Sequence, residues 1–359
     1  MKINIVLPSF PRVMTGGYKI MLEYANELAR QGDDVMVYFV MKLPYCKRRH
    51  TNLYCWLKSW WFKRKKPSWI SIDKRIRTKS VYSLNNYEIR DADVLFFTEC
   101  QVALSLDKLS RRKGVTVNLI QGYEKWILPT IELLEESFRR ADFNVVISDY
   151  LVPLVEKATG KRPAVCYNAF NVNRFHITKP IAEREKTTVA MLFHQDEIKG
   201  CKYGLEALRI CKQQFPGLRL KLFGLYVPQT DLEDWITFEY NPKDLCELYN
   251  DVSVFLTPSL NEGWGLTAME SMACGCALVS TDVDGLRVFA IDGQTALTAP
   301  PADGKALANR LSELMSDDKK RQKIAENGYE FVQQFTWERA VGRLRSILLK
   351  VNEECKKEN

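Results

Sequence analysis

The sequence predicts an α/β protein built from two doubly wound, Rossmann-like domains. Its 359 residues exceed one ordinary hydrophobic core, so two domains of roughly 150–200 residues are expected. Short apolar runs alternate with amphipathic helical stretches, which is the pattern of βαβ units and of parallel sheets. Two such domains facing each other would form a central ligand cleft between the carboxyl ends of their strands.

The first domain is expected to span residues 1–175. It opens with a buried strand, a turn at Gly16 and Gly17, an amphipathic helix that ends at Gly32, and a second strand. The strands predicted in this domain cover residues 3–8, 33–40, 92–98, 115–121 and 143–148.

The second domain is expected to span residues 176–336, after a polar and basic linker at 180–186. A last helix covers much of 337–359. The strands predicted in the second domain cover residues 187–194, 218–224, 251–259 and 276–282, and the helices cover 203–215, 242–251, 302–317 and 318–335.

Composition indicates a cytoplasmic globular protein. Apolar residues make up 46% of the chain and charged residues 27%, and no run of about 18 apolar residues is present. The start lacks the long apolar core of a secretion signal. The ten cysteines form no C-x-x-C pair, which is typical of reduced thiols in the cytosol.

The residues for metal or serine-hydrolase chemistry are poorly represented. The three histidines lie far apart in the sequence, and no G-x-S-x-G elbow is present. Two D-x-D triplets occur, at 91–93 and 282–284, and the first opens a buried strand. We interpret both triplets as structural acids, and no metal site is expected.

Glycine turns provide better candidates for ligand binding. Gly16 and Gly17 follow the first strand and open a helix, where unpaired N–H groups and the helix dipole suit a diphosphate. Glu262 precedes a second turn, at Gly263 and Gly265, and Glu270 lies inside the helix that follows. Each carboxylate can accept two hydroxyl hydrogens, as in the binding of vicinal diols. In the alternative interpretation, Glu262 is only an acid at the helix N-terminus and Glu270 is only a solvated acid on the helix.

A cation for the phosphates is available in the loop after the first strand of the second domain. Lys199 lies there, followed by Gly200 and a helix. Its ammonium group would neutralise charge growing on a departing diphosphate. A surface lysine beside a glycine is the ordinary alternative.

These motifs, taken together, resemble family 4 of the retaining glycosyltransferases, which have the GT-B fold. The resemblance covers the whole chain and is most specific in EGWGLTAMES, residues 262–271. It implies a metal-independent transfer with no cofactor beyond a nucleotide-sugar donor, and a last helix that returns to the first domain. It places Gly17 and Lys199 at the donor phosphates, Glu262 at the transferred hexose and Glu270 at the ribose. Backbone amides of Trp264, Gly265 and Leu266 would hold sugar and phosphate oxygens.

Two departures from the family pattern concern the donor phosphates and the acceptor. His194 stands where the family usually has an arginine, and an imidazole cannot donate the paired hydrogen bonds that a guanidinium group gives to a phosphate. A histidine common in the acceptor loop is absent here, so Gln121, Tyr123 or Glu124 is expected to contact the acceptor instead.

A basic aromatic stretch from Lys47 to Trp69 contains much of the excess charge of +8. Nucleic-acid binding is not expected, because no recognisable module is present. Tryptophans among cations suit an anionic membrane surface. The alternative is an ordinary solvated segment between two strands, with its aromatic side chains packed on the domain. The membrane-contact candidates are Trp56, Trp60, Trp61, Lys63, Arg64, Lys65 and Lys66.

The sequence therefore predicts a cytoplasmic hexosyltransferase, peripheral on the inner face of the membrane. It would transfer a hexose or deoxyhexose to a glycan or lipid-linked acceptor in cell-surface polysaccharide synthesis. Two alternatives stay open. One is a nucleotide-sugar epimerase, which would need further acid–base residues. The other is a non-catalytic partner subunit that binds nucleotide sugars, which the change from arginine to His194 would suit.

Overall fold

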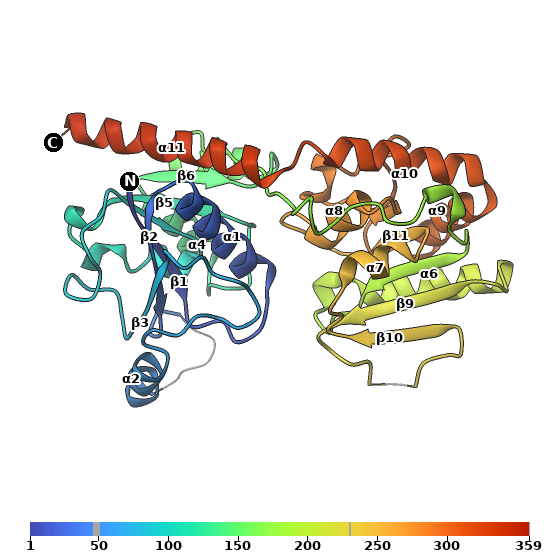
Figure 1. Ribbon diagram of the computed structural model, residues 1–359, viewed down its shortest axis with the longest axis horizontal. Coiled ribbons are helices and arrows are strands. Elements are labelled where there is room, and N and C mark those ends of the chain that lie inside the picture. The colour runs from blue at the N-terminus through green and yellow to red at the C-terminus, as the bar shows by residue number, and fades with distance from the viewer. Residues whose placement is uncertain (46–50, 230, 359) are drawn as a thin grey trace. The chain divides into compact units, whose positions relative to one another are not determined.

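The computed structural model describes all residues except 46–50, 230 and 359. The chain folds into two compact units, drawn in Figure 1. The first unit comprises Met1–Asn168 and Trp337–Asn359, and the second comprises Ala169–Thr336. The second unit thus begins at Ala169, before the boundary that the sequence suggested after Phe175.

The first unit is built on a seven-stranded parallel sheet with the order β3-β2-β1-β4-β5-β6-β7. Its strands are β1 (Lys2–Pro8), β2 (Asp34–Val40), β3 (Arg77–Val81), β4 (Val94–Phe97), β5 (Val115–Ile120), β6 (Phe143–Val146) and β7 (Ala164–Val165). Its helices are α1 (Gly16–Arg30), α2 (Asn52–Trp61), α3 (Cys100–Ala103), α4 (Ile131–Arg139), α5 (Leu151–Thr159) and α11 (Trp337–Glu358).

Both faces of this sheet are buried, which explains why its central strands are apolar at successive positions. Phe96 of β4 meets Tyr24 of α1 with ring centroids 6.1 Å apart. Its neighbour Phe97 points to the other face and joins a cluster with Val102 of α3. Because side chains alternate across a strand, a sheet covered on both sides needs apolar residues at every position.

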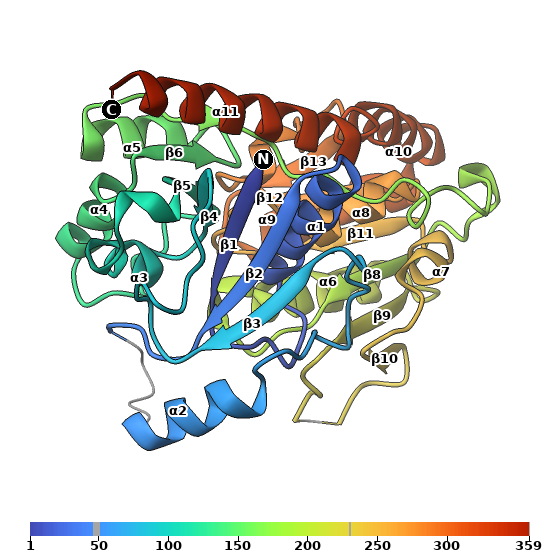
Figure 2. The same cartoon turned by 60° about the vertical axis from the view of Figure 1, so that its left-hand side comes forward.

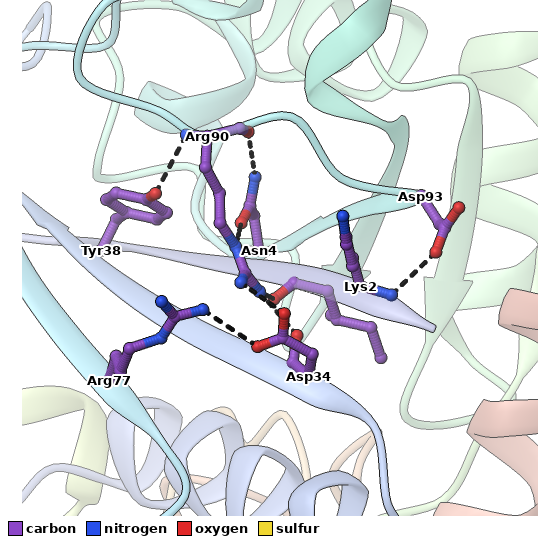
Figure 3. Close-up of polar contacts among 8 residues, drawn as sticks. Lys2, Asn4, Asp34, Tyr38, Arg77, Arg90 and Asp93 are labelled. Atoms are coloured by element: carbon purple, nitrogen blue, oxygen red, sulfur yellow. Dashed lines mark hydrogen bonds and ion pairs between the residues drawn. The ribbon is translucent and has the colours of Figure 1, made fainter.

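A polar network ties together the amino ends of three strands in this sheet, β1, β2 and β3 (Figure 3). The Arg90 guanidinium lies 2.7 Å from Asp34 at the start of β2, and it donates to Asn4 of β1 at 3.1 Å. Arg77 of β3 contacts the same carboxylate at 3.2 Å. Burial alone would raise the pKa of Asp34, but the hydrogen bonds from Arg90 and Arg77 lower it. The network lies at the edge of the sheet opposite the carboxyl ends of the strands.

Replacing Arg90 by methionine is expected to lower the free energy of unfolding by about 3 kcal/mol, because it leaves Asp34 and Asn4 without this donor. Arg112→Met is the matched control. Its side chain is 82% exposed and pairs with Asp91 at the surface, so a change of about 0.5 kcal/mol or less is expected. Urea unfolding of the two variants measures both values, and equal losses would contradict a structural role for the network.

Helix α11 packs on the first unit, although it follows the second unit in the chain. Trp337 lies edge-on to Tyr24 of α1, with ring centroids 5.1 Å apart. Asp33 anchors the helix further along, since its carboxylate lies 3.1 Å from Arg345 and 2.7 Å from the amino group of Met1.

The second unit has a six-stranded parallel sheet with the order β10-β9-β8-β11-β12-β13. Its strands are β8 (Thr188–Leu192), β9 (Arg219–Gly224), β10 (Ile236–Tyr240), β11 (Val254–Thr257), β12 (Ala277–Thr281) and β13 (Ala296–Ala299). Its helices are α6 (Cys201–Gln214), α7 (Leu245–Asn250), α8 (Leu266–Ala273), α9 (Gly304–Ser316) and α10 (Asp318–Val332). A core of buried residues such as Val189, Leu208 and Leu311 joins the sheet to α6 and α9.

The linker predicted at 180–186 is wrong, because this segment is an integral part of the second unit. Arg184 is only 4% exposed. Its guanidinium donates to the carbonyl oxygens of Lys179 and Cys274 at 2.8 and 2.6 Å, and to Asn250 at 2.9 Å. A basic residue that the sequence placed in a linker is here a buried hydrogen-bond donor.

Candidate donor site

The topology of the second sheet concentrates loops at one point. The chain runs outward from β8 to β9 and β10, then returns to the other side of β8 with β11, β12 and β13. The order therefore reverses between β8 and β11. In open α/β sheets, ligands bind beyond the carboxyl ends of the strands at such a switch point. Lys199 follows β8, and Glu262 follows β11.

Lys199 and Glu262 meet at this switch point. The Lys199 ammonium lies 2.8 Å from Oε1 of Glu262, and the hydroxyl of Ser259 donates to the same oxygen at 2.9 Å. The side chains of Lys199 and Glu262 are 29% and 13% exposed, so the pair is partly shielded from water but remains reachable. An acid and a cation 63 positions apart are thus held in one small polar site.

Backbone contacts hold the two loops together. The amide of Leu260 donates to the carbonyl oxygen of Ile198 at 2.7 Å. Gly200 has a φ of +61°, and a Cβ there would lie 1.9 Å from the carbonyl oxygen of Pro258. Only glycine permits both this left-handed conformation and this approach. The position of Lys199 relative to Glu262 is therefore fixed by main-chain packing.

The glycine turn after Glu262 forms the start of α8. Gly265 caps the helix with a φ of +90°, and Leu266 is the first helical residue. Trp264 is 3% exposed and packs between Phe289 and Phe335, with ring centroids 5.6 and 5.4 Å away. The Trp264 side chain thus anchors the turn in the core, which leaves its backbone as the part suited to ligand contact.

Glu270 lies about one turn into α8 and is only 2% exposed, so it is not a solvated helix acid. Tyr249 of α7 is fully buried. Its pKa is raised well above the usual value, first by burial and then by the charge of Glu270. Among the described residues, the Tyr249 hydroxyl has no hydrogen-bond partner. The Glu270 charge is therefore felt at the Tyr249 hydroxyl inside this unit.

His194 follows β8 and has a defined tautomer. Its Nδ1 accepts a hydrogen bond from the amide of Asp196 at 3.0 Å, so the proton of the neutral ring resides on Nε2. Burial, then the nearby charge of Lys199, lowers the pKa of His194 below 6.5. The Tyr226 ring, 40% exposed, lies edge-on at 4.6 Å. His194 is therefore a neutral, single hydrogen-bond donor at neutral pH.

Because the pKa of His194 is lowered in the folded state, this residue is expected to make the stability of the protein depend on pH. The neutral form is favoured in the folded state, so its contribution is complete above pH 6.5 and is lost as the pH falls toward the folded-state pKa. The melting temperature of both proteins is measured at pH 7.5 and at pH 5.5, and all groups other than His194 titrate alike in the two. The melting temperature of His194→Gln is expected to fall less between these pH values than that of the unmodified protein. A larger loss in the variant would contradict a neutral His194.

In the first unit, two of the predicted residues lie together. Gly16 and Gly17 form the first turn of α1, beyond the end of β1. Gln121, at the end of β5, donates to the carbonyl oxygen of Gly17 at 3.3 Å and to the Thr98 hydroxyl at 3.2 Å. A Cβ on Gly17 would lie 3.4 Å from the Gln121 amide nitrogen. The turn is therefore tightly covered by this side chain.

The remaining acceptor candidates lie in the loop after β5. Tyr123 donates to Glu135 of α4 at 3.2 Å, and burial, followed by the charge of Glu135, raises the pKa of Tyr123. The Glu124 side chain folds back over Gly122. These two residues follow Gln121 closely in the sequence, and each already has a partner within the first unit.

Sequence reasoning missed Glu99, which lies at the switch point of the first sheet. The order of this sheet reverses between β1 and β4, and Glu99 is the second residue after β4. Its φ is +81°, which a glutamate rarely adopts, and burial raises its pKa. Strained residues of this kind cluster at functional sites. The available signal was a polar Thr-Glu pair directly after a buried strand.

The acids of the two D-x-D triplets all lie in ion pairs or backbone contacts. Asp91 pairs with Lys113 at 2.8 Å, and Asp93 accepts from the amide of Lys2 at 2.7 Å. Arg287 lies 2.6 Å from Asp282 and 3.6 Å from Asp284. Within the described part of the chain, no group of three or more histidine, cysteine or acidic residues is arranged to hold a metal ion.

Part of the chain is similar in sequence to known glycosyltransferases. Residues 173–331, which lie within the second unit, match the family described as glycosyl transferases group 1. D-inositol 3-phosphate glycosyltransferase of Corynebacterium diphtheriae is 35% identical over 106 residues, which are 30% of this chain and 25% of the relative. The chain thus spans about a quarter of the length of this curated relative.

Two further proteins extend the comparison. The capsular polysaccharide biosynthesis glycosyltransferase CapM of Staphylococcus aureus is 24% identical over 155 residues, covering 39% of this chain and 41% of CapM. The structure of Anabaena HepE in complex with UDP-glucose superimposes with a TM-score of 0.70 at 15% identity, covering 100% of this chain and 99% of HepE. The two parallel sheets with their helices therefore have the GT-B fold, as the sequence predicted.

Proposed function

We propose that this protein is a retaining glycosyltransferase of family 4 that uses a nucleoside-diphosphate hexose or deoxyhexose as donor. The observation that carries the proposal is the Lys199–Glu262 contact of 2.8 Å at the switch point of the second sheet. That contact joins a phosphate-binding cation to a hydroxyl-binding acid within a domain of the group 1 type. The UDP-glucose complex of HepE, which shares the fold, supports the choice of donor class.

Each predicted donor residue has a defined role in this proposal. The Lys199 ammonium neutralises the diphosphate, and Glu262 accepts hydrogen bonds from hydroxyls of the transferred sugar. Glu270 accepts from the ribose. The amides of Gly263 to Leu266 bind phosphate and sugar oxygens at the start of α8, where the helix dipole favours anions. His194 donates one hydrogen bond from Nε2, without the charge of an arginine.

The transfer breaks the bond between the anomeric carbon and the donor phosphate oxygen. The acceptor oxygen bonds to the same face of that carbon, and the acceptor proton passes to the leaving phosphate, so the nucleoside diphosphate departs with the bonding electron pair. Charge accumulates on this diphosphate in the transition state. A fixed lysine ammonium therefore stabilises the transition state more than the ground state.

The first unit supplies the acceptor contacts in this proposal. Gln121, Tyr123 and Glu124 follow β5 at the carboxyl edge of the first sheet and are assigned to the acceptor, whereas Gly17, covered by Gln121, is assigned to the donor diphosphate. Glu99 adds a partly buried acid at the same edge. We propose a glycan or lipid-linked acceptor at the inner face of the membrane and a role in cell-surface polysaccharide synthesis. CapM, a relative named for capsular polysaccharide biosynthesis, supports this setting.

Donor turnover tests the proposal. The protein is incubated with labelled UDP-, GDP- and dTDP-sugars and a lipid and glycan extract as acceptor, and released nucleoside diphosphate is measured. One donor is expected to be consumed only with acceptor present, and Glu262→Ala is expected to lose orders of magnitude in rate. The anomeric coupling constant of the product reports retention. Product with the inverted configuration would contradict the mechanism.

A second candidate function rests on His194. Because it is a neutral donor in the place of a family arginine, a nucleotide-sugar-binding subunit without catalysis is the alternative. Such a subunit would bind donor with the same dependence on Lys199 but would release no nucleoside diphosphate with any acceptor. The turnover assay, paired with a donor-binding measurement, separates the two functions.

A further inference from the structure

Helix α2 has its apolar side facing solvent. Leu53, Trp56, Leu57 and Trp60 are 65%, 55%, 47% and 65% exposed. They are spaced as i, i+3, i+4 and i+7, so they form one continuous face of the helix. On a helix that belongs only to a globular core, such a face would point inward. Contiguous exposed apolar surface of this kind marks an interaction site.

The opposite side of α2 is anchored to the first unit. Cys55 is 5% exposed, and α2 packs against β3 at the rim of the unit (Figures 1 and 2). Just after the helix, Phe62 is buried and stacks on Phe10 with ring centroids 4.3 Å apart. The carbonyl oxygen of Lys63 accepts from the amide of Ser80 at 3.0 Å. The outward direction of the apolar face is thus fixed by packing on the other side.

A run of cations borders this apolar face. Residues 63–66 are four consecutive basic residues, and all are exposed. Lys65 lies over the Trp61 ring at 4.6 Å from its centroid, and Trp61 is itself 61% exposed. No aspartate or glutamate occurs between Asp34 and Asp73 in the sequence. The surface therefore combines tryptophans and leucines with a local excess of basic residues.

We propose that α2 and residues 63–66 form a docking surface for an anionic lipid leaflet, with the helix lying in the plane of the membrane interface. The apolar face would enter the boundary between headgroups and acyl chains, while the cations contact lipid phosphates. Tryptophan favours this interfacial zone. Charge complementarity with anionic headgroups selects lipid over a neutral protein partner. Leucines at the centre of the face suit acyl chains better than stacked nucleic-acid bases.

This mode of attachment needs no spanning segment. Within the described residues, no helix combines the length and apolar character required to cross a bilayer. The docking surface is independent of the donor site, because it lies in the first unit and contains neither Lys199 nor Glu262. Its failure in a test would leave the proposed glycosyltransferase function untouched.

Vesicle sedimentation of the full chain, without donor, tests the docking surface. Phosphatidylcholine vesicles are compared with vesicles that also contain phosphatidylglycerol, and strong binding is expected only for the second. Lys63→Gln/Arg64→Gln is expected to lower the partition coefficient about 30-fold, at about 1 kcal/mol per basic residue. Trp56→Ser/Trp60→Ser is expected to lower it by about tenfold or more through lost apolar burial. Both variants replace exposed side chains, so circular dichroism should show an unchanged fold.

A control variant and three contrary outcomes complete the test. Tyr87 is fully exposed elsewhere on the first unit, so Tyr87→Ser should bind vesicles as the unmodified protein does. Equal binding to both vesicle types, or unchanged binding of the Trp56→Ser/Trp60→Ser variant, would overturn the proposal. Retention of a short RNA by the unmodified protein, with no binding to anionic vesicles, would identify a nucleic-acid surface and overturn it as well.

Discussion

Replacing Lys199 by methionine is expected to lower kcat/KM for sugar transfer by about 10²–10³-fold, roughly 3–4 kcal/mol of transition-state stabilisation. The Lys199 ammonium lies 2.8 Å from Glu262 and is partly shielded from water, so its charge acts at short range. Methionine keeps the length and apolar stem of the side chain but removes the charge. Steady-state kinetics with the donor identified by the turnover assay measures the effect.

Lys202→Met is the matched control for this substitution. Lys202 lies three positions further on, at the start of α6, and is exposed with its ammonium over the Tyr203 ring. Its loss should leave kcat/KM within about twofold, as for a surface residue. Glu262→Gln combined with Lys199→Met should lose less than the sum of the single effects, because the two groups are in contact. Full additivity, or an equal effect of Lys202→Met, would contradict a shared site.

Gly285→Ala is expected to lower transfer activity by about 100-fold or more and to destabilise the second unit by about 1–3 kcal/mol. Gly285 has a φ of −70°, which alanine adopts readily, so backbone strain is not the cause. A Cβ at this position would lie 2.4 Å from the carbonyl oxygens of Glu262 and Gly263. The turn that carries Glu262 would have to shift. Kinetics and thermal unfolding of the same preparation measure both effects.

Gly217→Ala provides the control within the same unit. Its Cβ would meet only the Thr187 hydroxyl, at an ordinary 3.7 Å, so activity and stability should both stay near those of the unmodified protein. A Gly285→Ala variant with full activity would show that the Glu262 turn tolerates displacement. That outcome would argue against a precisely placed carboxylate at this position.

Much of the candidate donor site could be predicted from local sequence. A glycine at a left-handed position such as Gly265 and a polar residue after a buried strand are both visible in the sequence. The reversal of strand order, which brings Lys199 to Glu262, follows from the βαβ rule once the strands are known. The roles of these residues in donor binding stay predictions that the experiments above address.

The strands that sequence reasoning missed are short or lie at sheet edges. β3 and β10 include exposed polar side chains, since edge strands are covered less completely. β7 has two residues, and β13 reads Ala-Leu-Thr-Ala, with few residues of high strand propensity. These strands contain too few apolar residues to be recognised by a search for continuous apolar runs.

The environments of individual side chains could not be predicted from the sequence either. The 2% exposure of Glu270 depends on α7 packing against α8, and the tautomer of His194 depends on a backbone turn at Asp196. Glu99 acquires its position from the order of the first sheet and its strain from the turn into α3. Each of these features arises from long-range packing or exact loop conformation, which residue spacing does not encode.

Thermal unfolding with a series of UDP-, GDP- and dTDP-sugars tests most directly whether the second unit holds a nucleotide sugar at Lys199 and Glu262. One donor, at 100 times its Kd, should stabilise the unmodified protein by about 2.7 kcal/mol. The same concentration should give a much smaller shift with Lys199→Met and an unchanged shift with Lys202→Met. Equal stabilisation of Lys199→Met, or no shift of the unmodified protein with any donor, would contradict the account.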